Sequence, residues 1–176
     1  MSPLGTIHVA LASLAILSGA ATLLTTPKGG RLHKRLGYTY VTSMVLTNAT
    51  ALGLYHLFGT FGPFHALAII SLISVGFGTA FAVRARYARR ARDLARRERL
   101  ISAHYRTIAY SYAGLIAAFA SEIAVRAPVV RSSVGPDALF AAVVMGASLT
   151  VMAVASYLIR TRASGALQPF RAPARP

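Results

Sequence analysis

Five long apolar runs, separated by short polar or basic segments, dominate the pattern of this chain. They cover residues 6–26, 38–60, 64–83, 100–125 and 138–159. About 20 mostly apolar residues are enough for an α-helix to cross the hydrocarbon layer of a bilayer. The runs are interrupted by Pro27-Lys28-Gly29-Gly30 and by Phe61-Gly62-Pro63, which are typical helix ends. The pattern therefore predicts an all-α, polytopic membrane bundle with five transmembrane helices.

The five runs leave little of the chain for a second domain. We expect one transmembrane domain at residues 1–160, followed by a basic cytoplasmic tail at residues 161–176. Charged types make up 13% of the residues, whereas a soluble domain has about 25%, so the composition argues against an ordinary soluble enzyme. Cysteine is absent from the sequence, which excludes disulfides, thiolate metal sites and a cysteine nucleophile.

Nearly all of the basic residues lie on one side of the membrane when the chain is threaded through it five times. Of the 19 Lys and Arg, 17 fall in segments 28–35 and 84–99, at Arg106, or after residue 159. Because basic loops stay in the cytoplasm, we expect the N-terminus outside and the C-terminus inside a cell inner membrane. The basic excess then faces anionic inner-leaflet lipids, and nucleic acid is not an expected partner.

Two basic segments are candidates for contact with these lipids. The residues concerned are Lys28, Arg31, Lys34, Arg35, Arg89, Arg90, Arg96 and Arg97. Segment 84–99 predicts a helix that extends from the membrane, and segment 28–37 predicts a glycine-rich basic turn. A solvated linker that obeys the positive-inside rule and a specific lipid or partner contact both fit this pattern.

Ionisable side chains within a span are costly, so each one is a candidate functional residue. His8, His56 and His65 lie near the expected outer ends of the first three spans, and Glu122 lies near the outer end of the fourth. His8, His65 and Glu122 together would suit a transition metal. The alternatives are histidines that only form hydrogen bonds at the interface, and a Glu122–Arg126 pair at i, i+4 spacing.

A second pair of histidines lies near the expected inner face. His33 falls in the basic turn, where we expect a loop and not a helix, and His104 lies at the start of the fourth span. Imidazoles from facing segments at one depth can bind a b-type haem as two axial ligands. All five histidines are therefore candidate cofactor ligands. Simple hydrogen bonding and the handling of protons or a substrate are the other interpretations.

These positions resemble a bacterial family of predicted integral membrane proteins that is known only as a domain of unknown function. The motifs are His8 in a helix of small residues, segment 28–37, and His104-Tyr105-Arg106 followed by Ser111-Tyr112-Ala113. The resemblance covers about the first 126 residues. The chain departs from the family pattern where Tyr105 separates His104 from Arg106. The resemblance implies that His8, His33, His104 and Arg106 are the important positions, and it implies no activity.

Together these features predict an integral membrane protein that binds haem or a metal through histidines, in a redox or electron-transfer role. A non-catalytic structural or assembly subunit of a membrane complex is the alternative. A small proton-coupled transporter is a third possibility, which would require a homo-oligomer because one chain supplies only five spans. Whether the protein is an enzyme is left open by the sequence.

The charge distribution predicts that residues 84–99 are cytoplasmic. A reporter protein that works only in the cytoplasm should be active when it is inserted within this segment. Activity of a periplasmic reporter at the same position would contradict the predicted threading.

Overall fold

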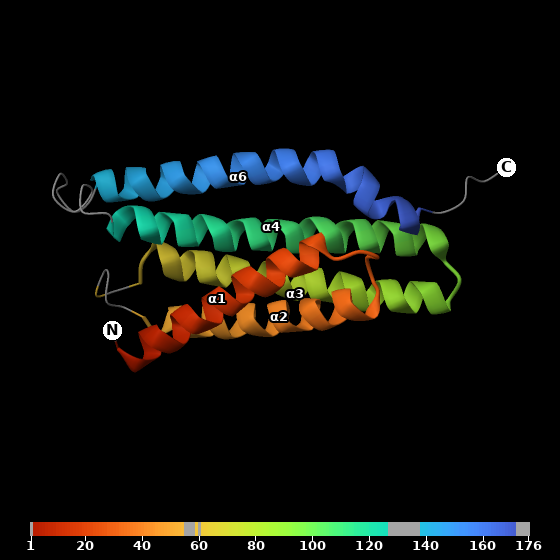
Figure 1. Ribbon diagram of the computed structural model, residues 1–176, viewed down its shortest axis with the longest axis horizontal. Helices are drawn as coiled ribbons and strands as arrows, with labels where there is room; N and C mark the ends of the chain where they lie inside the picture. The colour runs from red at the N-terminus through yellow and green to blue at the C-terminus, as the bar shows by residue number, and fades with distance from the viewer. Residues whose placement is uncertain (1, 55–58, 60, 127–137, 172–176) are drawn as a thin grey trace.

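The computed structural model describes residues 2–54, 59, 61–126 and 138–171 (Figure 1). The elements are α1 (Pro3–Leu24), α2 (Arg31–Leu52), α3 (Pro63–Arg90), α4 (Leu94–Arg126), α6 (Ala138–Leu167) and a short 3₁₀ helix, η1 (Gln168–Phe170). No strand occurs among these residues. The predicted all-α fold class is therefore confirmed.

The helices run up and down along one common axis. Figure 1 shows α3 and α4 side by side, with α2 next to α3, α6 next to α4, and α1 crossing α2 at an angle. The α1–α2 turn, the α3–α4 turn and η1 lie together at the right-hand end of this view. We call this end, formed by residues 22–38, 79–106 and 160–171, the basic end.

Four of the five long helices are long and apolar enough to cross a membrane. The segments are Pro3–Leu24, Phe64–Arg90, Leu94–Ala124 and Ala142–Phe170. Large apolar side chains on the outside of the bundle, such as Leu17, Ile70 and Leu149, are more than half exposed, as expected for a surface that contacts lipid. The fifth long helix, α2, has a basic first turn and packs mainly against α1 and α3.

The beginning of α2 differs from the sequence-based expectation. The helix starts at Arg31, so His33 lies in its first turn, and the prediction of a loop at His33 is wrong. Gly30 adopts an extended conformation (φ −67°, ψ 176°) and is the N-cap, so only the residues up to Gly30 form the turn. The buried residues Tyr40, Met44 and Asn48 follow at i+4 spacing, and their burial against neighbouring helices stabilises this longer helix.

Other boundaries also differ from the expected spans. The described part of α2 ends at Leu52, not at Thr60, and α6 continues beyond Ile159 to Leu167. The basic segment between α3 and α4 consists of two helix ends joined by residues 91–93. Asp93 caps the start of α4, because its Oδ1 accepts a hydrogen bond from the Arg96 N–H at 2.9 Å.

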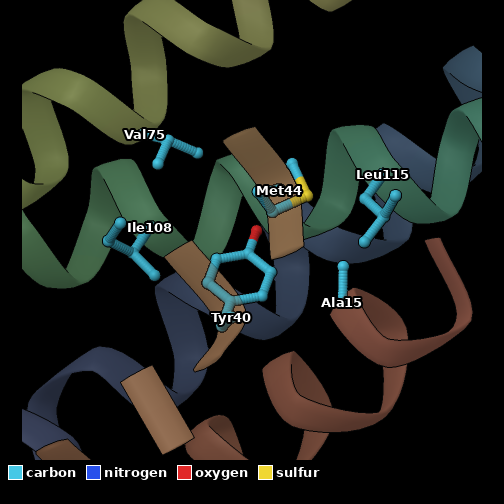
Figure 2. Close-up of a cluster of buried hydrophobic side chains, with 6 residues drawn as sticks. All are labelled: Ala15, Tyr40, Met44, Val75, Ile108 and Leu115. Carbon is cyan, nitrogen blue, oxygen red and sulfur yellow. The ribbon is translucent and has the colours of Figure 1, made fainter. Parts of the chain in front are cut away.

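The core is a cluster of side chains from α1, α2, α3 and α4. It contains Ala15, Tyr40, Met44, Val75, Ile108 and Leu115 (Figure 2). Tyr40 is only 1% exposed, and its hydroxyl lies 2.8 Å from Oγ of Ser111 on α4. Its ring also meets Tyr112 edge to face, with centroids 6.2 Å apart. Buried polar groups need such partners, so this hydrogen bond stabilises the contact between α2 and α4.

Gly19 allows α1 to approach the two tyrosine rings, and we expect Gly19→Ala to destabilise the bundle. A Cβ atom at Gly19 would lie 2.5 Å from Cδ2 of Tyr112 and 2.9 Å from Cδ2 of Tyr40. The rings would have to move, which costs about 1–3 kcal/mol. Thermal unfolding in detergent measures this loss. Gly76→Ala is the control, because a Cβ at Gly76 meets nothing within 4 Å. Equal melting temperatures for the two variants would contradict the prediction.

Candidate ligand-binding cavity at the basic end

A cavity of about 830 Å³ lies at the basic end of the bundle. The α1–α2 turn, α2, α3, α4 and the last residues of α6 and η1 contribute to its walls. Its inner part is apolar and includes Tyr40, Val41, Ile101 and Ile108. Cavities of about 300–1,000 Å³ with mostly apolar walls are typical of sites for small molecules and cofactors. Tyr40 connects this cavity to the core, since it belongs to both.

His33 from α2 and His104 from α4 line this cavity together. The structure therefore brings both members of the expected inner pair to one place, although they are 71 positions apart in the sequence. His104 donates a hydrogen bond from Nδ1 to the carbonyl oxygen of Gly78 on α3, at 2.8 Å. Because that carbonyl can only accept, the proton is on Nδ1 of the neutral ring. The lone pair on Nε2 of His104 is then available to a ligand.

The imidazole of His33 is held in a different way. It forms a hydrogen bond with the backbone of Thr22, and its Nδ1 is buried without a hydrogen-bond partner among the described residues. Burial lowers the pKa of His33 from its ordinary value of 6.5, and the nearby charge of Lys28 lowers that pKa further. The His33 ring is therefore neutral at pH 7, which is the state that can coordinate a metal.

Basic residues surround the mouth of the cavity. They are Lys28, Lys34, Arg86, Arg89, Arg90 and Arg97. Among the residues that the structure describes, no Asp or Glu lines this cavity. Lys28 also caps α1, donating to the carbonyl oxygens of Leu23 at 2.6 Å and Thr22 at 3.2 Å, and burial lowers its pKa. The excess of positive charge favours a ligand that carries anionic groups.

Five of the eight basic residues expected to face lipid line this cavity, namely Lys28, Lys34, Arg89, Arg90 and Arg97. Arg31, Arg35 and Arg96 are exposed and are not part of its lining. Sequence reasoning missed Arg86, which is only one of several arginines in its segment. It also missed Phe170, whose ring packs beneath the Arg97 guanidinium, with 5.3 Å between Cζ and the ring centroid. No sequence signal connects Phe170 with this site.

The expected outer group is not assembled into one set of ligands. Nδ1 of His8 lies 3.1 Å from the Thr47 carbonyl oxygen and 3.0 Å from Oγ1 of Thr50, so this ring joins α1 to α2. His65 is buried, and its Nδ1 accepts a hydrogen bond from the Gly62 N–H at 3.0 Å, which caps α3. Within the described ranges, no three His, Asp or Glu side chains lie close enough to hold a metal ion.

The outer group also includes Glu122 and His56. Glu122 is half-buried on α4, and the side chain of Arg126, its expected partner, lies outside the described part of the chain. His56 also lies outside the described residues. The basic end is therefore the place where the described candidate residues meet.

The comparison with known families agrees with the resemblance found in the motifs. The profile of the family described as "Predicted membrane protein (DUF2306)" matches residues 5–159, so the chain belongs to this family of membrane proteins of unknown function. Neither the curated proteins nor the solved structures provide a match. The match includes His33 and His104 but not Phe170, and it supplies no ligand or activity.

The lowered pKa of His33 predicts that folded-state stability decreases as the pH falls below about 6.5. The folded protein takes up a proton on His33 less readily than the unfolded chain does, so acid favours the unfolded chain. Thermal unfolding in detergent at pH 7.5 and 5.5 should show this loss, and His33→Gln should reduce it. His104 is present in both proteins, so the comparison reports the change at His33. Equal losses in parent and His33→Gln would contradict the prediction.

Proposed function

We propose that this member of the DUF2306 family binds one b-type haem between His33 and His104 and transfers electrons at the inner face of the cell inner membrane. The observation that carries the proposal is that imidazoles from two different helices line one large cavity. Two axial imidazoles are the ligand set of many b-type haems. The proposal concerns the basic end alone, because the two described outer histidines, His8 and His65, are engaged by hydrogen bonds with α2 and with the start of α3.

The contacts of the two rings support this assignment. A histidine that ligates a metal commonly donates its other N–H to a backbone carbonyl, which fixes the ring and the tautomer. His104 makes this contact with Gly78. The ring of His33 is likewise held by a backbone group, through its hydrogen bond with Thr22.

The other walls of the cavity suit the rest of a haem molecule. A haem is a flat, largely apolar ring with two carboxylates on one edge. The apolar inner wall around Tyr40 and Ile108 suits the ring, and the basic mouth suits the carboxylates. Arg97 is a guanidinium group at this mouth that can form paired hydrogen bonds with a carboxylate.

The charge distribution supports a site that faces the cytoplasm. The basic end contains the segments that the positive-inside rule assigns to the cytoplasm. A haem at this depth would exchange electrons with a donor or acceptor at the inner face. The reporter experiment on residues 84–99 tests whether the basic end faces the cytoplasm.

The purified protein, produced in cells supplied with a haem precursor, should show a Soret band and about one haem per chain by the pyridine haemochrome assay. We expect His33→Ala and His104→Ala each to lower haem occupancy on the order of tenfold or more, because each removes an imidazole that would hold the haem. His8→Ala is the control and should retain the haem, since His8 lies near the start of α1 (Pro3–Leu24), and α1 begins at the end of the bundle opposite the basic end (Figure 1).

Two outcomes would contradict the proposal. A colourless parent protein that co-purifies with fixed membrane partners would favour the structural or assembly subunit. Equal haem occupancy in the parent and in His33→Ala would show that the haem is bound elsewhere. The insertion of each variant is checked by its yield in the membrane fraction and by its elution from a sizing column.

A further inference from the structure

The mouth of the cavity is bridged by one hydrogen bond between α2 and α3. Nη2 of Arg86 donates to the hydroxyl oxygen of Tyr38 at 3.0 Å. Lys34 precedes Tyr38 by one helical turn on α2, and it lines the same cavity. Since the Tyr38 oxygen accepts from Arg86, the hydroxyl hydrogen of Tyr38 can itself be donated. The three side chains thus offer an ammonium, a guanidinium and a hydroxyl donor at one opening.

This side of the cavity opens toward the surroundings of the bundle. Tyr38 is 57% exposed and Val83 is 41% exposed, and both also line the cavity. Gly37 also lines the cavity, and a Cβ added to it would meet nothing within 4 Å. An apolar chain lying along the outside of α2 and α3 could therefore continue into the cavity beside Gly37 and Val83.

The depth of the opening corresponds to the headgroup layer of a bilayer. The apolar part of α3 ends at Val83, and Arg86 follows three residues later, which is about 4.5 Å along the helix axis. The headgroup layer adds about 5–7 Å on each side of the hydrocarbon core. Arg86, and Tyr38 bonded to it, therefore lie where the phosphates of lipids are found when Val83 marks the edge of the core.

We infer that Lys34, Tyr38 and Arg86 form a binding site for the phosphate of an anionic phospholipid, with one acyl chain entering the cavity between α2 and α3. The charge of the mouth, its depth and its open side all agree with this ligand. The site does not depend on the proposed haem, because none of its three donors is among the residues proposed to hold that group. It differs from general attraction of the basic end to anionic lipid, because only certain basic residues line the mouth.

The sequence offers a matched control for each basic residue of the site. Arg84 is exposed two positions before Arg86, and Arg35 is exposed next to Lys34, yet neither lines the cavity. Arg86→Gln and Lys34→Gln therefore remove a charge from the site. Arg84→Gln and Arg35→Gln remove the same charge beside it.

The experiment is native mass spectrometry of the protein released from nanodiscs that contain equal amounts of phosphatidylglycerol and phosphatidylcholine. The parent should retain phosphatidylglycerol in preference, with about one molecule per chain bound most tightly. Arg86→Gln and Lys34→Gln should each lower this retention at least about fivefold, while the two control variants keep the retention of the parent. Tyr38→Phe should lower retention by a smaller factor, since it removes one neutral donor.

Several results would overturn the inference. An equal loss in all four charge variants would show attraction to the whole basic surface, and no preference for phosphatidylglycerol would show no phosphate site. Binding of inorganic phosphate as tight as that of phosphatidylglycerol would show that the acyl chain contributes nothing. If Arg86→Gln fails to fold, the pair Lys34→Gln and Arg35→Gln decides the question.

The same measurement on His33→Ala separates the two proposals. Retention of phosphatidylglycerol in this variant, after loss of the haem, supports a lipid site that stands by itself. Loss of the lipid together with the haem would overturn the claim that the lipid site is independent. A parent protein without haem that still retains phosphatidylglycerol would contradict the proposed function and support the lipid site.

Discussion

The packing of α1, α2 and α4 around the ring of Tyr40 determines where this bundle is closed and where it is open. On one side of Tyr40, small residues such as Ala15 and Gly19 let α1 approach the tyrosine rings closely, and the bundle is filled by side chains. On the other side, the helix ends enclose the large cavity, of which Tyr40 is also a wall. The hydrogen bond to Ser111 holds the ring in this position. Lipid tails are as apolar as the helix surfaces, so the hydrophobic effect does little to hold helices together in a bilayer. Close packing and hydrogen bonds therefore decide much of how these helices associate.

The chemistry of the cavity follows from what its cations can and cannot pair with. Lys28 is occupied with the carbonyl groups at the end of α1, and Arg86 is bonded to Tyr38. Neither contact neutralises charge, and no described carboxylate lines the cavity. Placing several positive groups around one opening is costly unless anions compensate them. Carboxylates of a cofactor in the interior and the phosphate of a lipid at the mouth would both meet this need.

The two proposals use different parts of one space. The imidazoles of His33 and His104 come from α2 and α4, whereas the bridge at the mouth joins α2 to α3. A lipid at the mouth would cover the side of the cavity that opens toward the bilayer. A cofactor held by the histidines would then be separated from the hydrocarbon by that lipid. The last residues of the described chain, with Phe170 beneath Arg97, cover another part of the cavity.

The sequence by itself determined the number of long helices, the all-α class, the membrane environment and the accumulation of basic residues at one end. These properties depend on local hydropathy and charge, which can be read along the chain. The sequence also singled out His33 and His104, but it placed His33 in a loop, because the local pattern of Gly and Lys resembles a turn. Tertiary packing made that segment helical, since burial of the face around Tyr40 outweighs the weak local preference.

Only the tertiary structure decided which side chains meet. The bridge between Tyr38 and Arg86 and the pair of histidines in one cavity join positions that are far apart in the chain. Such contacts depend on how each helix is rotated and where the helices diverge, and hydropathy does not specify either quantity. The tertiary structure also gives the two described outer histidines their partners, since His8 is bonded to α2 and His65 caps its own helix.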